Sequence, residues 1–333
     1  TEANDGTIVE KVYRTNIPGT GFEADKANRY VKYEFVSPKD ASGNYTKTAI
    51  KEYSRDKNGN VTEVKEYDYV TYSTVPRNNI GIANGLPSGA TPARISKTEY
   101  YNDTPDASST TYTDTESYHL ASSPRIRNAV KSTEVQDANQ TPKSRSEITY
   151  DNASTTANPT ATKSWDSTKG TYSNPLTTNS ISISISYDSY GNPTSSTDAK
   201  GNQTQITYGS INGYSGLYPT QTVAAYGTSV AQTTTAEYDF YTGIVKKATA
   251  LGNTTAENVS TETEYDELGR AKKVKTAVNT AHEIWTQTEY DDINRRVVVK
   301  ADIETIGDAR KVATQFYDQL GRVRLSKTLE DAA

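Results

Sequence analysis

A tyrosine–aspartate motif that returns at a nearly fixed interval is the feature that most constrains how this chain can fold. Near-complete copies of Tyr-Asp-x-x-Gly-Arg occur twice, a third copy has asparagine in the glycine place, and two shortened copies precede them. The residues that define the copies are Tyr187, Asp188, Gly191, Tyr238, Asp239, Gly243, Tyr265, Asp266, Gly269, Arg270, Tyr290, Asp291, Asn294, Arg295, Tyr317, Asp318, Gly321 and Arg322. The tyrosines at 187, 238, 265, 290 and 317 are 51, 27, 25 and 27 residues apart, so the first step covers about two units. Such a period is typical of stacked supersecondary units that complete one another.

Each residue type of the motif has a mechanical role in a β-hairpin. The carboxylate of Asp266 can accept backbone N–H groups two residues on, as in an Asx-turn, and Gly269 can supply the positive φ that closes the turn. Asn294 takes the glycine role in its copy. Tyr265 then ends one strand, and Arg270 starts the next. The sequence therefore predicts a tandem array of hairpins.

Tyr-Asp-x-x-Gly-Arg at this spacing resembles the YD repeat of the Rhs (rearrangement hotspot) family. The stretch 198–208 resembles the other common form of that repeat, and the resemblance extends from about Tyr187 to the C-terminus. It implies a long β-sheet wound as a spiral into a hollow shell, as in bacterial polymorphic toxins, insecticidal toxin complexes and the extracellular part of teneurins. In that family the shell sequesters a toxic C-terminal domain, which a chain-end module releases by aspartyl autoproteolysis. This sequence shows neither the module nor a toxin domain.

The composition suits a thin sheet better than a thick core. Hydrophobic residues make up 33% of the chain and mean hydropathy is −0.78, whereas 25 tyrosines accompany only 4 phenylalanines and 2 tryptophans. Tyrosine buries apolar area while its hydroxyl stays hydrogen-bonded, so tyrosine ladders can join strands where no deep core exists. We expect an all-β chain of tandem YD/Rhs hairpin repeats that form a long, curved or spiral antiparallel sheet, a section of a shell wall.

Three regions are expected along the chain. Residues 1–150 read as an N-terminal β-rich region with degenerate repeats, a hairpin at 57–60 and a loop insertion near 75–92, where prolines and glycines gather. Residues 151–180 read as a polar loop region, and residues 181–333 as the YD/Rhs repeat array. Where that array begins, Ser180–Tyr187 alternates isoleucine with serine, which predicts a long strand with one dry face.

Residue types that carry chemistry are scarce. The chain has no cysteine, and its two histidines, His119 and His282, lie in no metal-ligand spacing. No phosphate-binding loop and no Gly-x-Ser-x-Gly elbow occurs. The net charge of −5 is small, and basic residues are interspersed with acidic ones, which argues against a nucleic-acid-binding surface. No apolar run is long enough to span a membrane. We therefore expect no enzymatic activity, no cofactor and no metal site. The repeated aspartates could offer calcium ligands, but capping of turns explains them better.

The function favoured by these patterns is structural. The chain would be a non-catalytic part of a β-shell that encloses or presents a toxin or another polypeptide, secreted or at the cell surface, with the rest of a longer Rhs-type polypeptide or its enclosed cargo as partner. The alternative is an extracellular adhesion or carbohydrate-binding module, in which Trp165 and Trp285 would stack on glycans of a cell surface. An enzyme such as a β-solenoid lyase or hydrolase ranks third. An open array also exposes its terminal strands, so edge-to-edge self-association is expected.

Overall fold

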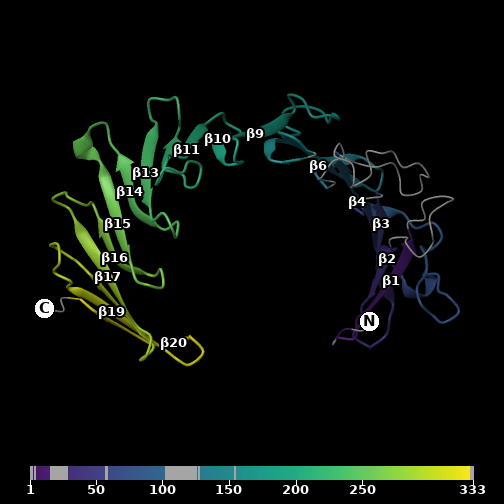
Figure 1. Ribbon diagram of the computed structural model, residues 1–333. Coiled ribbons are helices and arrows are strands. Elements are labelled where there is room, and N and C mark those ends of the chain that lie inside the picture. The colour runs from purple at the N-terminus through teal and green to yellow at the C-terminus, as the bar shows by residue number, and fades with distance from the viewer. Residues whose placement is uncertain are drawn as a thin grey trace. The chain divides into compact units, whose positions relative to one another are not determined.

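A computed structural model describes residues 3, 5–15, 29–56, 59–101, 126, 128–153 and 155–330 (Figure 1). Among these residues the regular structure consists of twenty β-strands and two single-turn 3-10 helices, without an α-helix. The chain forms two compact units, Thr1–Ile185 and Ser186–Ala333, which we call unit 1 and unit 2. Within each unit every strand pairs antiparallel with the strands before and after it in the sequence. The prediction of an all-β chain of antiparallel hairpins is confirmed.

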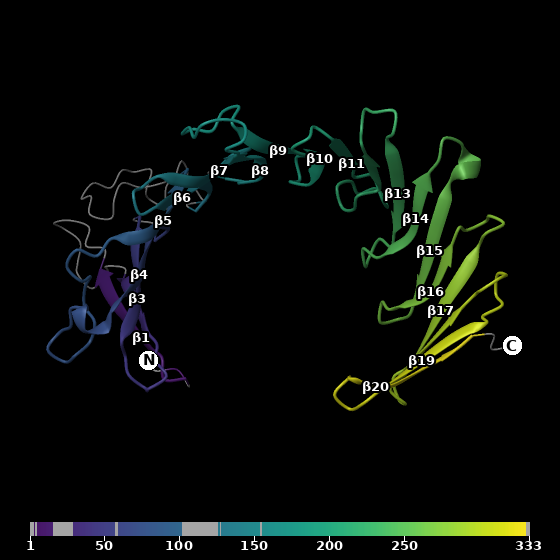
Figure 2. The same cartoon turned by 180° about the vertical axis from the view of Figure 1, so that it is seen from behind.

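The strands of unit 1 are β1 (Ile8–Thr15), β2 (Arg29–Ser37), β3 (Lys47–Arg55), β4 (Val61–Thr71), β5 (Pro92–Tyr100), β6 (Val130–Asp137), β7 (Pro142–Tyr150) and β8 (Pro159–Trp165), and the 3-10 helix η2 (Tyr72–Thr74) follows β4. Strand β9 (Ser180–Tyr187) contains the boundary between the units. The strands of unit 2 are β10 (Pro193–Thr197), β11 (Gln203–Thr207), β12 (Gln221–Ala224), β13 (Gln232–Tyr238), β14 (Val245–Leu251), β15 (Val259–Tyr265), β16 (Ala271–Thr276), β17 (Ile284–Asp291), β18 (Arg296–Ala301), β19 (Lys311–Tyr317) and β20 (Val323–Leu329), and the 3-10 helix η4 (Thr255–Glu257) precedes β15. Figure 2 shows the strands of unit 2 from behind as a succession of hairpins.

Unit 1 buries a small core on one face of its first four strands. Phe35, Ile50 and Tyr67 are direct cross-strand neighbours there, and the first two are 0% and 1% exposed. The segment between β4 and β5 is a loop that adds Val75 and Ala83 to the same cluster. A loop is sufficient here in place of a second sheet layer, because only the first four strands have a core face that needs covering.

The opposite face of these strands carries alternating charges. Lys11, Glu34, Lys51 and Glu66 lie opposite one another on β1–β4, with Lys11–Glu34 and Lys51–Glu66 ion pairs of 3.1 and 2.9 Å. Exposed ion pairs of this kind stabilise the folded state only slightly. Opposite charges on neighbouring strands nevertheless favour the correct register, and they keep this face of the sheet hydrated.

In unit 2, strands β13–β16 have a charged face of the same kind, and the unit has almost no core. Glu237, Lys247, Glu262 and Lys275 are successive cross-strand neighbours on β13–β16, whereas the other face carries small uncharged residues such as Ala248 and its cross-strand neighbours. Val278, which is 9% exposed, is the one buried hydrophobic residue within 186–330. Unit 2 is therefore a single-layer sheet with both faces exposed to solvent. Its strands are held in place by contacts with the neighbouring strands rather than by a core.

Two expectations for the middle of the chain are wrong. Residues 151–180 were expected to be a polar loop, but β8 lies within them and pairs with β7 and β9, because Thr and Ser side chains suffice for a strand with partners on both sides. The isoleucine face of β9 is not dry, since Ile181 and Ile183 are 41% and 44% exposed. Alternation marks a buried face only where another layer covers it.

Candidate functional site

The repeat motif forms a five-residue turn held by its aspartate. The N–H of Asp266 donates to the carbonyl of Arg270 at 2.9 Å, and the N–H of Gly269 donates to the carbonyl of Asp266 at 3.0 Å. The Asp266 carboxylate Oδ1 accepts the N–H groups of Leu268 and Arg270 at 3.0 and 2.9 Å. Gly269 has φ +76°, a conformation that costs glycine little. The Asx-turn predicted for the motif is present.

The same turn recurs along both units, including copies that the sequence analysis missed. In each of them, the N–H of the first turn residue donates to the carbonyl four residues later, and the N–H of the fourth turn residue donates to the carbonyl of the first. The turns start at Asp40, Asp56, Asn78, Asp137, Asp188, Asp198, Asp266 and Asp318. Asp-x-x-Gly without the tyrosine is the signal that could have found the turn at Asp40–Gly43, whereas Asn78 replaces the aspartate and Gln140 the glycine in two other turns. The hairpin expected at 57–60 is framed by Asp56 and Asn60, although Lys57 and Asn58 lie outside the described residues.

The last residue of the turn closes over the carboxylate in both forms of the repeat. Arg270 and Arg322 donate through Nε to Oδ2 of Asp266 and Asp318 at 2.7 and 2.8 Å. In the asparagine form, Asn202 donates through Nδ2 to Asp198 at 2.8 Å. Arginine and asparagine are alternatives there because each offers a side-chain N–H to the same oxygen.

The copy at Tyr290 departs from the roles expected of it. Asn294 does not carry the positive φ: Arg295 does, at +52°. Arg296 rather than Arg295 donates through Nε to Asp291, at 2.9 Å. The cause is the hairpin register, in which Asp291 pairs directly with Arg296, so the turn is one residue longer than at Asp266. Asn294 instead donates its amide to the Asp291 carboxylate at 2.9 Å.

In the copies at Tyr265 and Tyr290, the tyrosine hydroxyl bonds to the preceding repeat. The hydroxyl of Tyr265 donates to the carbonyl of Val245 at 2.8 Å, and that of Tyr290 donates to the carbonyl of Ala271 at 3.1 Å. Both acceptors are the first residues of strands that leave the previous motif turn. Tyr100 in unit 1 makes the equivalent bond to Val61 at 3.1 Å.

The other motif tyrosines vary around this theme. Tyr238 donates to the carbonyl of Pro219 at 2.9 Å, whereas Tyr317 donates to Gln315 within its own strand at 2.7 Å. Tyr187 is the last residue of β9. Tyr238, Tyr265 and Tyr290 therefore each tie their repeat to the hairpin before it, whereas the hydroxyl of Tyr317 bonds within its own strand.

Arg270 adds a second tie between repeats. Besides Asp266, its guanidinium binds both carboxylate oxygens of Asp292 in the next turn, at 2.8 and 3.0 Å. It also lies over the ring of Tyr290, with Cζ 4.1 Å from the centroid. Hydrogen bonds that Arg270 donates to Asp292 and then to Asp266 raise the pKa of Arg270, and the guanidinium lowers the pKa of Asp292. A bidentate, stacked arginine fixes the position of the neighbouring turn more tightly than lysine would.

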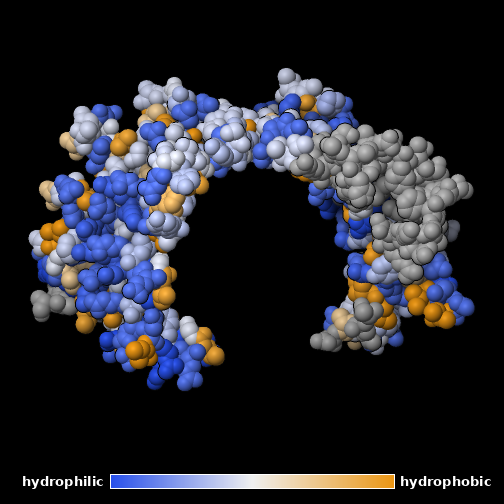
Figure 3. Space-filling view, in the orientation of Figure 1, coloured by the Kyte–Doolittle hydropathy of each residue, from blue (hydrophilic) through white to orange (hydrophobic). Residues whose placement is uncertain are grey.

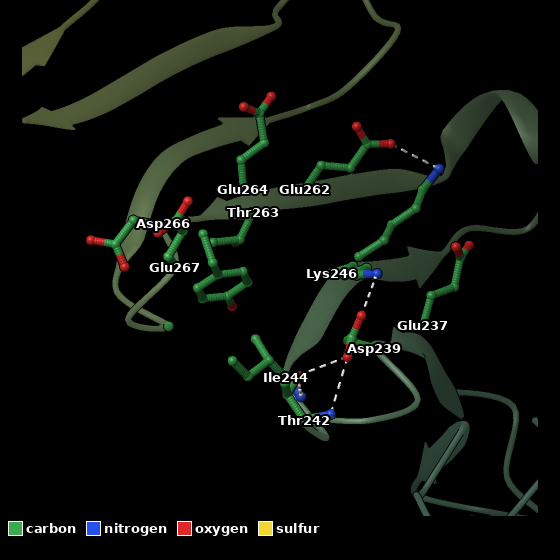
Figure 4. Close-up of a pocket in the computed structure, with 13 residues that line it drawn as sticks. Glu237, Asp239, Thr242, Ile244, Lys246, Glu262, Thr263, Glu264, Asp266 and Glu267 are labelled. Atoms are coloured by element: carbon green, nitrogen blue, oxygen red, sulfur yellow. Dashed lines mark hydrogen bonds and ion pairs between the residues drawn. The ribbon is translucent and has the colours of Figure 1, made fainter.

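A pocket of about 560 Å³ lies between two consecutive turns of unit 2 (Figure 4). Its apolar lining comes from Ile244, Tyr265 and Gly269. Carboxylates and lysines border it, and two ion pairs, Lys246–Asp239 at 2.7 Å and Lys247–Glu262 at 3.2 Å, neutralise part of that charge. We call this pocket the notch.

The turn aspartates are engaged as hydrogen-bond acceptors. The ammonium of Lys246, together with N–H and O–H donors of Thr242, lowers the pKa of Asp239 to about 2. Four backbone N–H groups likewise lower the pKa of Asp308 to about 2. Within the described ranges no three His, Asp or Glu side chains are grouped as metal ligands. His282 is exposed in the loop before β17, and His119 lies outside the described residues.

The two tryptophans lie in different units, and each contacts its own neighbours. Trp165 meets the ring of Tyr172 edge-on at 5.5 Å and donates its indole N–H to Gly170 at 3.2 Å. Trp285 has the Lys273 ammonium 2.9 Å from its ring centroid and donates to Glu283 at 3.2 Å. These contacts occupy part of the surface that stacking on a sugar would need.

Unit 1 contains a buried ionic cluster that the sequence did not reveal. Arg145, which is 5% exposed, binds Glu134 at 3.0 Å and Glu147 at 2.8 Å. Tyr172, from the loop after β8, donates to Glu134. Burial raises the pKa of Glu134, but hydrogen bonds from Tyr172, Gln136 and Arg145 outweigh it and keep that pKa low. Burial and the Glu134 carboxylate raise the pKa of Tyr172 to about 12. The cluster anchors this loop to the sheet.

No protein-family model matches the chain, and no curated protein matches its sequence. Among solved structures, a crystal structure of TcdB2-TccC3 without its hypervariable C-terminal region aligns at TM-score 0.41 and 14% identity, over 88% of this chain and 16% of that one. A TcdB2-TccC3-TEV structure gives 0.39 and 14%, over 88% and 17%. The Photorhabdus luminescens Tc holotoxin pore gives 0.24 and 10%, over 90% and 17%. This chain thus spans less than a fifth of each. In the described part of the chain, no helix is long and apolar enough to cross a membrane.

Proposed function

We propose that this chain is a non-catalytic structural segment of a Rhs/YD-repeat protein. Its repeats would build part of a β-wall that encloses or presents another polypeptide, secreted or at the cell surface. The observation that carries the proposal is the use of the motif side chains: Tyr265, Asp266 and Arg270 all serve to close a turn or to join it to the next repeat.

A wall function also agrees with the faces of unit 2. A sheet with one charged face and one face of small uncharged side chains, as on β13–β16, can separate two aqueous spaces without a second layer. Its polar surfaces offer little to which an unfolded polypeptide would adhere, since strong non-specific binding needs large exposed apolar area. The turn carboxylates are held by N–H donors, which leaves them poorly suited to exchange protons during catalysis near neutral pH.

The test uses the native product recovered with an antibody against this chain. We expect a polypeptide longer than 333 residues, in which a segment outside the repeats resists protease until denaturant is added. The double variant Tyr265→Phe/Tyr290→Phe, which removes two ties, should expose that segment to protease sooner. The matched control is Tyr226→Phe, in the loop after β12, where the tyrosine is 41% exposed. Equal cleavage of the segment in native and denatured product would refute the wall function.

A further inference from the structure

The turns along one edge of unit 2 all present a large apolar side chain to solvent. This edge holds the loops that follow β9, β11, β13, β15, β17 and β19, and we call it the apolar rim. Its exposed tips are Tyr190 (72% exposed), Tyr214 (62%), Tyr241 (88%), Leu268 (74%), Ile293 (91%) and Leu320 (76%). In Figure 3 the hydrophobic residues of this unit stand as separate spots among hydrophilic ones.

The turn geometry does not require apolar tips. Turns of the same backbone form elsewhere carry polar residues at the equivalent position: Ser42 after Asp40, Asn139 after Asp137 and Lys200 after Asp198. Ile80, which is 73% exposed, is an exception in unit 1. On the opposite edge of unit 2, only the loops after β12 and β18 expose large apolar residues within 186–330. An apolar tip in every hairpin of one edge therefore needs its own explanation.

The tips form a regular series. Each is two strands from the next, which places neighbouring tips about 10 Å apart because strands lie about 4.8 Å apart. Ties between consecutive loops stiffen the series: Asn192 donates to the Gly216 carbonyl at 2.8 Å, and Arg270 binds Asp292. A partner that contacts all the tips must itself be regular at this pitch.

The notch supplies the complementary feature on the same rim. It lies between the turn that carries Tyr241 and the turn that carries Leu268. Its volume of about 560 Å³ is several times that of one leucine side chain, and its floor of Ile244 and Tyr265 is apolar. An edge with both protruding tips and an apolar notch offers the two parts of a self-complementary surface, which a two-fold interface between identical chains requires.

The exposed area agrees with a specific dimer. Three of the six tips are tyrosines, and aromatic side chains bury roughly 150–250 Å² each, so these three together with the smaller Leu268, Ile293 and Leu320 present on the order of 800 Å² per chain. Stable protein–protein interfaces bury about 800 Å² per partner. We propose that the apolar rim is the interface with a second copy of this chain, the tips of one copy entering the spaces between the tips of the other. The proposal does not rest on the wall function.

The experiment measures the molar mass of the purified chain against concentration by sedimentation equilibrium. The rim variant is Leu268→Asn/Ile293→Asn/Leu320→Asn, which keeps turn-compatible residues, and Ile244→Lys tests the notch. The control is Ile303→Asn/Ile306→Asn on the opposite edge, where both isoleucines are about half exposed. Circular dichroism confirms that each variant folds.

We expect a concentration-dependent dimer of the wild-type chain and of the control. The rim variant should weaken the dimer at least a hundredfold and Ile244→Lys at least tenfold, because apolar burial is lost in each. A wild-type chain that stays monomeric at every concentration would overturn the proposal. So would association that persists unchanged in the rim variant, since it would then run through another surface such as the open edge of β20.

Discussion

At the residue scale, the tyrosine of the repeat is the side chain that links one repeat to the repeat before it. Its ring fills space beside the strand while its hydroxyl donates to a carbonyl that the previous hairpin leaves available, as Tyr265 does to Val245. This bond is partly buried, and a carbonyl shielded from water without a donor is costly, so the hydroxyl removes part of a penalty as well as adding a bond. This accounts for tyrosine rather than phenylalanine in the motif.

Replacing these hydroxyls tests that role. Tyr265→Phe and Tyr290→Phe should each lower the free energy of unfolding by about 0.5–1.5 kcal/mol, the usual net value of a hydrogen bond. Urea denaturation followed by circular dichroism measures the change. Tyr317→Phe, which loses only a bond within its own strand, should cost less. Equal losses at all three positions would argue against a tie between repeats.

The turn aspartates predict acid sensitivity. The pKa of Asp239 is lowered to about 2 from a usual value of 3.8, so the folded state holds the proton less tightly than the unfolded chain. Its contribution to stability is present above pH 4 and is lost as the pH falls through 2. The urea midpoint should therefore decline between pH 4 and 2, and Asp239→Asn should flatten that decline. A parallel decline in the variant would contradict this assignment.

At the element scale, hairpin turns decide the register of the array. Gly269 has φ +76°, and a Cβ there would meet only Ile244, at 3.4 Å. Gly269→Ala should therefore destabilise through the backbone alone, by about 1–2 kcal/mol. Gly269→Asn should cost less, because asparagine tolerates this conformation. Differential scanning calorimetry would compare the two melting temperatures, and a larger loss for asparagine would contradict the backbone explanation.

Strand β9 gives a prediction about faces. Ile181→Thr/Ile183→Thr should change the free energy of unfolding by less than about 0.5 kcal/mol per site, as is usual for exposed positions. Ile50→Ala, at a side chain 1% exposed, should cost about 2–5 kcal/mol. Thermal denaturation of the three chains provides the comparison. A large loss at β9 would mean that its isoleucine face is covered in solution.

Sequence alone was sufficient for the elements that rest on local turn chemistry. The hairpins at Asp266 and Asp318 follow from Asp and Gly at fixed spacing, since those residues act within five positions. The β9 face, the strand β8 and the roles of Arg295 and Arg296 could not be predicted, because they depend on what covers a face or on a one-residue difference in register. The Arg145 cluster joins β6, β7 and a distant loop, so no local pattern marks it.

At the scale of the whole molecule, the two units illustrate different ways to stabilise strands. Unit 1 buries Phe35 and Ile50 under a loop, whereas unit 2 relies on paired charges and on ties between consecutive repeats. In an array of this kind, stability is a sum of repeat terms and nearest-neighbour terms. Removing one complete repeat should then leave the remaining contacts intact.

Deletion of residues 266–290 tests this account most directly. It joins Tyr265 to Asp291, so the tie from Tyr265 to Val245 and the bond between Arg296 and Asp291 are both kept. We predict a soluble, cooperatively unfolding chain with an unchanged β-type circular dichroism spectrum per residue. Deletion of 266–278, which removes one strand and breaks the antiparallel alternation, should fail to fold. If the whole-repeat deletion also fails, or if the two deletions behave alike, the chain is not an array of units coupled to their nearest neighbours.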